Sequence, residues 1–156
     1  MKTETERPAV NSSLEPGGRA RQIPVPKRAK AISRLSRIDY ADAFEVDVNP
    51  GDRSLTGEQW ARRMLEGTPR ETQVTLRAGW TMIGLKLGPA GSPEHVLGWE
   101  IGDSGPDHVL LVADSRTGMP AELLFKPEGG RFLFCTFIRQ ANPLMKVIWW
   151  PVERNH

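Results

Sequence analysis

Apolar and polar residues alternate along residues 40–48, which is the pattern of a β-strand with one buried face. Phe44, Val46 and Val48 fall on one side of this strand, and the acidic residues between them fall on the other. The Asn-Pro-Gly-Asp sequence at positions 49–52 is typical of a turn. The chain therefore predicts an amphipathic strand that ends in a tight turn.

A helix is predicted next, from Thr56 to about Glu66. Thr56 and Gln59 have the spacing of a capping box, in which each side chain bonds to the other residue's backbone N–H. Gly67 ends the pattern. The apolar residues at helical spacing, which form the predicted buried side, are Trp60, Ala61, Met64 and Leu65.

Residues 71–87 fit two patterns. Leu76, Trp80 and Ile83 recur at helical spacing, but alternate residues in the same segment suit a strand equally well. Glycines and threonines weaken a helix here, yet the segment is longer than a usual strand. We favour the helix and keep the strand as the alternative.

Four further segments, separated by Gly, Pro or Asp, predict an antiparallel meander. They are residues 96–101, 108–114, 121–126 and 131–139. In the third segment, Leu123 and Phe125 are predicted to face the core, while Glu122, Leu124 and Lys126 face a wetter side. In the last segment we assign Phe132, Phe134, Thr136 and Ile138 to the inner face, and Leu133, Cys135 and Phe137 to the opposite face.

The two ends of the chain complete this order of elements. Asn142 and Pro143 are typical of a helix start and predict a terminal helix of about three turns at most. Residues 1–37 hold nine Lys or Arg and three Glu but no aromatic residue, so we predict a disordered basic tail before a domain at residues 38–156. A solubilising leader, or an extension from an upstream start codon, is the simplest account of this tail.

Composition excludes several classes of protein. Hydrophobic residues make up 38% and charged residues 26% of the 156 residues, which is the balance of a globular chain. The longest apolar stretches are far shorter than the about 20 residues that cross a bilayer, so we expect no transmembrane segment. The chain has a single cysteine and its first residues do not resemble a secretory signal, which predicts a cytoplasmic location.

Motifs for catalysis or cofactor binding are also absent. The glycine pairs lack the context of a phosphate-binding loop, and the three histidines lack the spacing of metal ligands, so we expect neither a cofactor nor a metal. Cys135 lies within an apolar strand and is predicted to be a small buried hydrophobe and not a nucleophile. No serine lies in a nucleophile elbow.

The order of elements is similar to the helix-grip fold of the START-like, or SRPBCC, superfamily, which includes polyketide cyclases and the birch-pollen allergen. The segments YADAFEVDV, EQWARRML, LRAGWTMIGLKLG and HVLLVADS resemble an uncharacterised bacterial domain-of-unknown-function branch of that superfamily. The resemblance implies an α+β domain with an apolar cavity between a curved sheet and its last helix. Because that helix looks shortened or missing here, we expect either a truncated chain or a homodimer that covers the groove.

Aromatic residues dominate the predicted inner face and supply the candidate ligand-binding site. The candidates are Trp80, Trp99, Phe125, Phe132, Phe134, Thr136 and Trp149, with Arg77 and Tyr40 as further polar groups. Such a set either packs as ordinary core or encloses a pocket. The sequence leaves both alternatives open, and the resemblance favours the pocket.

These observations lead to three functional hypotheses. The first is binding of an apolar or amphipathic small molecule or lipid in that cavity, without catalysis or a cofactor. The second is a cyclase-like or dehydratase-like enzyme that adds a general acid or base, for which His108, Tyr40 and Asp39 are the candidates. The third is an interaction module whose basic tail holds an anionic polymer or membrane; specific nucleic-acid binding is not expected, because the tail lacks aromatic residues for base stacking.

Overall fold

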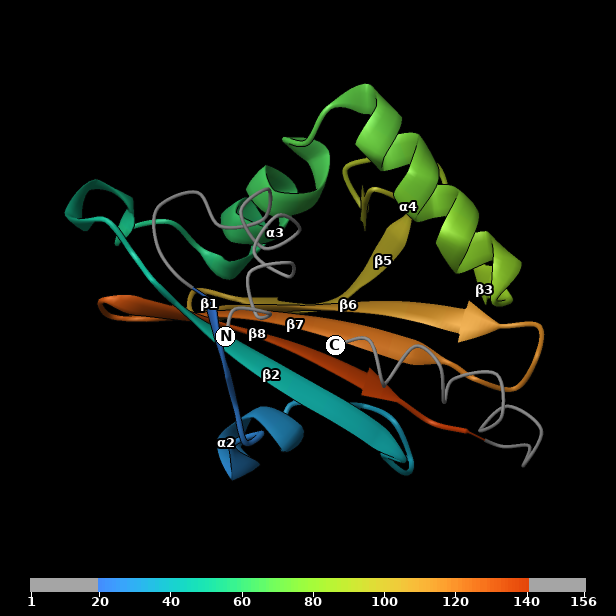
Figure 1. The fold of residues 1–156 in the computed structure, drawn as a ribbon, viewed down its shortest axis with the longest axis horizontal. Helices are drawn as coiled ribbons and strands as arrows, with labels where there is room; N and C mark the ends of the chain where they lie inside the picture. Colours follow the sequence, from blue (N-terminus) through green and yellow to red (C-terminus); the bar gives the residue numbers. More distant parts are fainter. Residues whose placement is uncertain (1–19, 141–156) are drawn as a thin grey trace, which may run out of the picture.

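The computed structural model describes residues 20–140, which form an α+β domain (Figure 1). The strands are β1 (Ala20–Ile23), β2 (Tyr40–Asp47), β3 (Leu85–Lys86), β4 (His95–Val96), β5 (Trp99–Gly105), β6 (His108–Ser115), β7 (Ala121–Glu128) and β8 (Arg131–Ile138). The helices are α2 (Lys27–Lys30), α3 (Gly57–Glu66) and α4 (Arg70–Met82), with a short 3-10 helix, η2 (Pro50–Asp52). The predicted terminal helix and Trp149 lie outside the described residues.

The strands form one open antiparallel sheet in the order β1-β2-β8-β7-β6-β5-β4, and β3 pairs with β6. The predicted meander is confirmed, because β5, β6, β7 and β8 pair in sequence. Strand β2 pairs with β8, which places Phe44 opposite Phe134. Helices α3 and α4 lie on one side of the sheet, here called the inner face, and α2 lies on the other side, the outer face (Figure 1). Within residues 20–140, no helix is both long enough and apolar enough to cross a bilayer.

The two helices predicted within residues 20–140 are confirmed, although the second ends at Met82, and residues 85–86, which were predicted to continue it, form strand β3. Helix α3 begins with the expected capping box, in which Gln59 N donates to Thr56 Oγ1 over 3.1 Å and Thr56 N donates to Gln59 Oε1 over 2.8 Å. Helix α4 resolves the ambiguous segment in favour of the helix. None of its residues is fully buried, and Met82 at its end is 85% exposed, so α4 covers the sheet only loosely.

The predicted strand at residues 96–101 is confirmed from Trp99 onward, as the start of β5, but it begins too early, because residues 95–98 are the first strand and the turn of a tight hairpin. Strands β4 and β5 pair antiparallel across a turn at Leu97 and Gly98, with Val96 opposite Trp99. Both turn residues have positive φ angles, 49° and 96°, which is the geometry of a two-residue hairpin turn. The sequence signal was weak, because Leu at the first turn position does not favour the left-handed region as Asn or Asp does.

The predicted disordered tail is also wrong for residues 20–37, which belong to the folded domain. Strand β1 pairs with β2, and a strap at residues 24–38 crosses the outer face. Ala29 in α2 is completely buried there, and Ile32, Leu35 and Ile38 pack against the same cluster. These aliphatic residues pack residues 24–38 onto the sheet, although the segment contains no aromatic residue. The part of the tail at residues 1–19 lies outside the described residues.

The strap corrects the predicted wet side of the sheet. Leu124, Leu133, Cys135 and Phe137 are 0% exposed, because the strap covers them. Glu122 is also buried on this face, where its carboxylate accepts hydrogen bonds from Ser33 Oγ over 2.6 Å and from Arg34 N over 3.0 Å. At the other end of the strap, Arg28 forms a bidentate ion pair with Glu128 over 2.7 Å. The sheet therefore has two covered faces.

Candidate functional site

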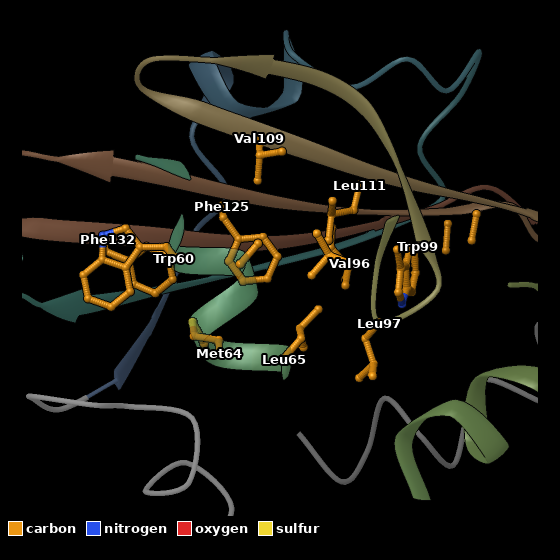
Figure 2. Close-up of a cluster of buried hydrophobic side chains, with 14 of the residues drawn as sticks. Trp60, Met64, Leu65, Val96, Leu97, Trp99, Val109, Leu111, Phe125 and Phe132 are labelled. Carbon is orange, nitrogen blue, oxygen red and sulfur yellow. The ribbon is translucent and has the colours of Figure 1, made fainter. Parts of the chain in front are cut away.

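The phenylalanines of the predicted site form a continuous aromatic row on the inner face. Phe125 lies 4.9 Å from Phe134 and 6.1 Å from Phe132 between ring centroids. Trp60 of α3 stacks on Phe132 at 4.7 Å, as Figure 2 shows. Phe125, Phe132 and Trp60 are almost fully buried, so this part of the set packs as hydrophobic core. The sequence predicts that Trp60 lies on the buried side of its helix. Helical spacing alone does not show that it stacks on Phe132.

Trp80 and Trp99 form a separate pair on the same face. Their rings are perpendicular with centroids 5.4 Å apart, and they join α4 to the start of β5. Trp99 is 2% exposed, whereas Trp80 is half-buried. The pair therefore lies where the loosely packed helix α4 meets the sheet, and one of its two rings is partly open to the surroundings.

The indole nitrogen of Trp99 is buried, and no group within residues 20–140 forms a hydrogen bond with it. In Figure 2 this nitrogen lies at the end of the ring nearer to Leu97. The perpendicular ring of Trp80 offers at most a weak N–H···π contact. A buried donor left without an acceptor costs about 1–3 kcal/mol, so its persistence calls for an explanation, such as an acceptor that a ligand supplies.

Arg77 lies one turn before Trp80 on α4 and reaches the same hairpin. Its Nη1 donates to Leu97 O over 3.1 Å and its Nη2 donates to Gly88 O over 3.3 Å. Gly98 is needed for this approach, because a side chain there would collide with Arg77 Nη1 and would be strained at a positive φ. Arg77 thus fixes the turn that precedes Trp99.

A hollow of about 310 Å³ adjoins this hairpin at Leu97. Its lining residues are Arg62, Glu66, Gln73, Ala90, Gly91 and Leu97. The guanidinium of Arg62 is already occupied, since it pairs with Glu58 and Glu66 over 3.1 Å and donates to the carbonyl oxygens of Pro93 and His95. These contacts hold the loop at residues 88–98 against α3. We therefore attribute the hollow to the way this loop is attached and do not treat it as a binding site.

Thr136 and Tyr40 lie elsewhere on the inner face. Thr136 is opposite Asp42 on β2 and Leu123 on β7. The hydroxyl of Tyr40 donates to Asp42 Oδ2 over 2.7 Å, and Asp42 is 5% exposed. The predicted polar groups therefore divide between two places, with Arg77 beside the tryptophan pair and Tyr40 with Thr136 on β2 and β8.

His108, a candidate general acid or base, lies on the outer face and so on the opposite side of the sheet from the tryptophan pair. Its ring contacts Asp103 Oδ2 over 2.8 Å and Asp107 Oδ1 over 3.2 Å. Burial alone lowers the pKa of His108, but the two carboxylates outweigh it and the pKa is raised. The two carboxylates therefore favour the protonated form of the His108 ring, with which they form ion pairs. Asp39 is similarly engaged, because it accepts from Arg37 and from Gln140 N.

Two further kinds of reactive group are the single cysteine and the metal-ligating side chains. Burial raises the pKa of the Cys135 thiol to about 12, so its thiolate is scarce at neutral pH. Cys135 is a buried hydrophobe, as predicted. No group of three or more His, Cys, Asp or Glu in the described part of the chain is arranged to hold a metal ion.

Comparisons of the chain with protein-family models, with curated proteins and with solved structures find no match. The resemblance to the SRPBCC superfamily therefore stays a prediction. What the described residues define is the class of the domain, an open antiparallel sheet with two helices on its inner face and a strap on its outer face. The function has to be argued from the tryptophan pair itself.

Proposed function

We propose that this domain binds an apolar or amphipathic small molecule against Trp80 and Trp99, and that the molecule carries a hydrogen-bond acceptor for Trp99 Nε1. The buried indole N–H, for which the described part of the chain offers no acceptor, is the observation that carries this proposal. An acceptor within the ligand would satisfy this donor. The half-buried ring of Trp80 supplies apolar surface for the rest of the molecule.

Two features support binding rather than core packing at this place. Helix α4 has no fully buried residue, so a ligand has less packing to displace here than beside Trp60 and Phe132. The pair also combines an apolar wall with one directed polar group, which is the usual composition of a small-molecule site. The proposal is thus a narrower form of the small-molecule hypothesis drawn from the sequence.

The test compares two probes that differ only in an acceptor, 2-acetylnaphthalene and 2-ethylnaphthalene. One neutral hydrogen bond contributes about 0.5–1.5 kcal/mol, so the ketone should bind the unaltered protein up to about tenfold more tightly. In Trp99→Phe, which keeps an aromatic ring but lacks the N–H, this preference should disappear. Dissociation constants from isothermal titration calorimetry measure both effects.

Trp60→Phe is the matched control, because it removes an indole from the same face but from the aromatic row on Phe132. It should keep the preference for the ketone. Absence of binding by both probes, or an equal preference for the ketone in Trp99→Phe, would show that the tryptophan pair is ordinary core.

A further inference from the structure

Two half-buried arginines, Arg62 and Arg77, contact the loop and hairpin at residues 88–98 but differ in their partners. Arg62 pairs with two carboxylates, Glu58 and Glu66. Arg77 contacts only carbonyl oxygens, and within residues 20–140 no carboxylate forms an ion pair with it. A guanidinium that is partly removed from water without a counter-ion carries an uncompensated cost, which an anion would relieve.

The hydrogen bonds of Arg77 leave donors available. A guanidinium has five N–H groups, and the bonds to Leu97 O and Gly88 O use two of them. These two carbonyls also fix the orientation of the guanidinium plane, because they belong to the two ends of one loop. Gly98 adds to this, since the absence of a side chain there lets Nη1 lie directly on the turn. The charge is therefore held in place before any ligand arrives.

Arg77 is also adjacent to the proposed binding site. It lies three residues before Trp80 on α4, and residues at that spacing lie on the same side of a helix. Arg77 binds the carbonyl of Leu97, and Trp80 contacts the ring of Trp99 two residues further along the chain. The charged group, the buried indole N–H and the apolar rings thus belong to one contact between α4 and the β4–β5 hairpin.

We infer that the ligand is an amphipathic monocarboxylate whose anionic group binds Arg77 while its apolar body lies against Trp80 and Trp99. This inference rests on the proposed function and adds the charge of the ligand to it. One uncompensated positive charge suits a monoanion. Planar carboxylates match the forked donors of arginine, and the alternative of a doubly charged phosphate would leave one negative charge unpaired.

The experiment uses three probes on one ring system, namely 2-naphthoate, its methyl ester and 2-naphthylmethylammonium. At pH 7 the full-length protein should bind the carboxylate about tenfold or more tightly than the ester, and the ammonium most weakly. In Arg77→Met, the affinity for the carboxylate should fall to that for the ester, while the affinity for the ester changes little. Arg77→Lys keeps the charge without the fork and should keep part of the preference.

Arg70→Met is the matched control, because Arg70 is exposed on the same helix and its loss changes the net charge equally. It should keep the full preference for the carboxylate. Circular dichroism of each variant shows whether the fold survives. If Arg77→Met misfolds, the inference is tested by Arg77→Lys and by the relative affinities of the three probes for the unaltered protein.

The two proposals fail in different ways. Equal binding of carboxylate and ester, together with a ketone preference that depends on Trp99, would overturn the monocarboxylate inference and leave the proposed function in place. A carboxylate preference that Arg77→Met keeps would also overturn the inference. Failure of every naphthalene probe to bind would overturn both.

Discussion

Trp99 and Glu122 are buried to the same extent but differ in the hydrogen bonds of their polar groups. Glu122 is 2% exposed on the outer face, where burial raises the pKa of its carboxyl and hydrogen bonds from Ser33 and Arg34 N partly offset that cost. Trp99 is also 2% exposed, yet none of the described residues accepts a hydrogen bond from its indole N–H. Within residues 20–140, the strap thus provides partners for the Glu122 carboxylate, whereas α4 and the hairpin provide none for Trp99 Nε1; Arg139 Nε is the other buried side-chain nitrogen without one. This contrast favours a functional role for Trp99.

At the scale of single residues, the His108 cluster predicts a dependence of stability on pH. Both ring nitrogens face carboxylates, so the folded state prefers the protonated ring, and its pKa lies above the unfolded value of about 6.5. The stabilisation is then fully present below about pH 6.5 and is lost as the pH rises through the folded-state pKa. Hydrogen bonds to His108 lower the pKa values of Asp103 and Asp107, so their contribution is present above about pH 3.9 and is lost in acid.

The His108→Gln variant should therefore lose most stability, relative to the unaltered protein, between about pH 4 and pH 6.5. Urea unfolding midpoints at pH 5.5 and pH 9 measure this difference, which should be smaller at pH 9. His95→Gln is the control, since the ring of His95 contacts Ser92 Oγ over 3.1 Å. A difference that grows towards pH 9 would contradict the ion-pair account.

At the scale of elements, the start of α3 depends on a glycine that lies against the sheet. A side chain at Gly57 would place its Cβ 2.5 Å from backbone atoms of His108 and Val109 at the start of β6. Backbone atoms cannot turn aside, so Gly57→Ala should shift α3 and cost about 1–3 kcal/mol, despite the higher helix propensity of alanine. Gly51→Ala, at a position with open space, should change stability by less than about 0.5 kcal/mol. Urea unfolding at pH 7 compares the two variants, and equal stabilities would refute this packing.

Local sequence signals explain which elements could be predicted. The capping box of Thr56 and Gln59 and the apolar stripe after it are properties of neighbouring residues, so α3 was predicted correctly. The turn at Leu97 and Gly98 depends on contacts with Arg77 and Glu66 from two helices, which spacing does not reveal. For the same reason, the sequence named Trp80, Trp99 and Arg77 but not their grouping or the unsatisfied indole N–H.

At the scale of the whole molecule, the strap makes the first described residues part of the core. Composition predicted a tail because residues 1–37 are basic and lack aromatic residues. The aliphatic residues among them join a cluster whose other members come mostly from strands much later in the chain, such as Leu124 and Leu133. The ion pair of Arg28 with Glu128 likewise joins residues 100 positions apart. Two of the basic residues expected to serve an external polyanion are likewise paired within the domain, Arg28 with Glu128 and Arg37 with Asp39.

A pair of alanines in and beside α2 tests whether the strap is part of the fold. Ala29 is 0% exposed against the cluster that contains Cys135, whereas Ala31 is exposed. Ala29→Asp would bury an unpaired charge at a cost of about 3–5 kcal/mol and should detach the strap, while Ala31→Asp adds the same charge in water. Detachment returns the pKa of Cys135 from about 12 towards its ordinary value of about 8.5, so a disulfide reagent at pH 8 should label Ala29→Asp more than about tenfold faster than Ala31→Asp. Equal labelling rates would mean that residues 24–38 are a dispensable leader, as the composition suggested.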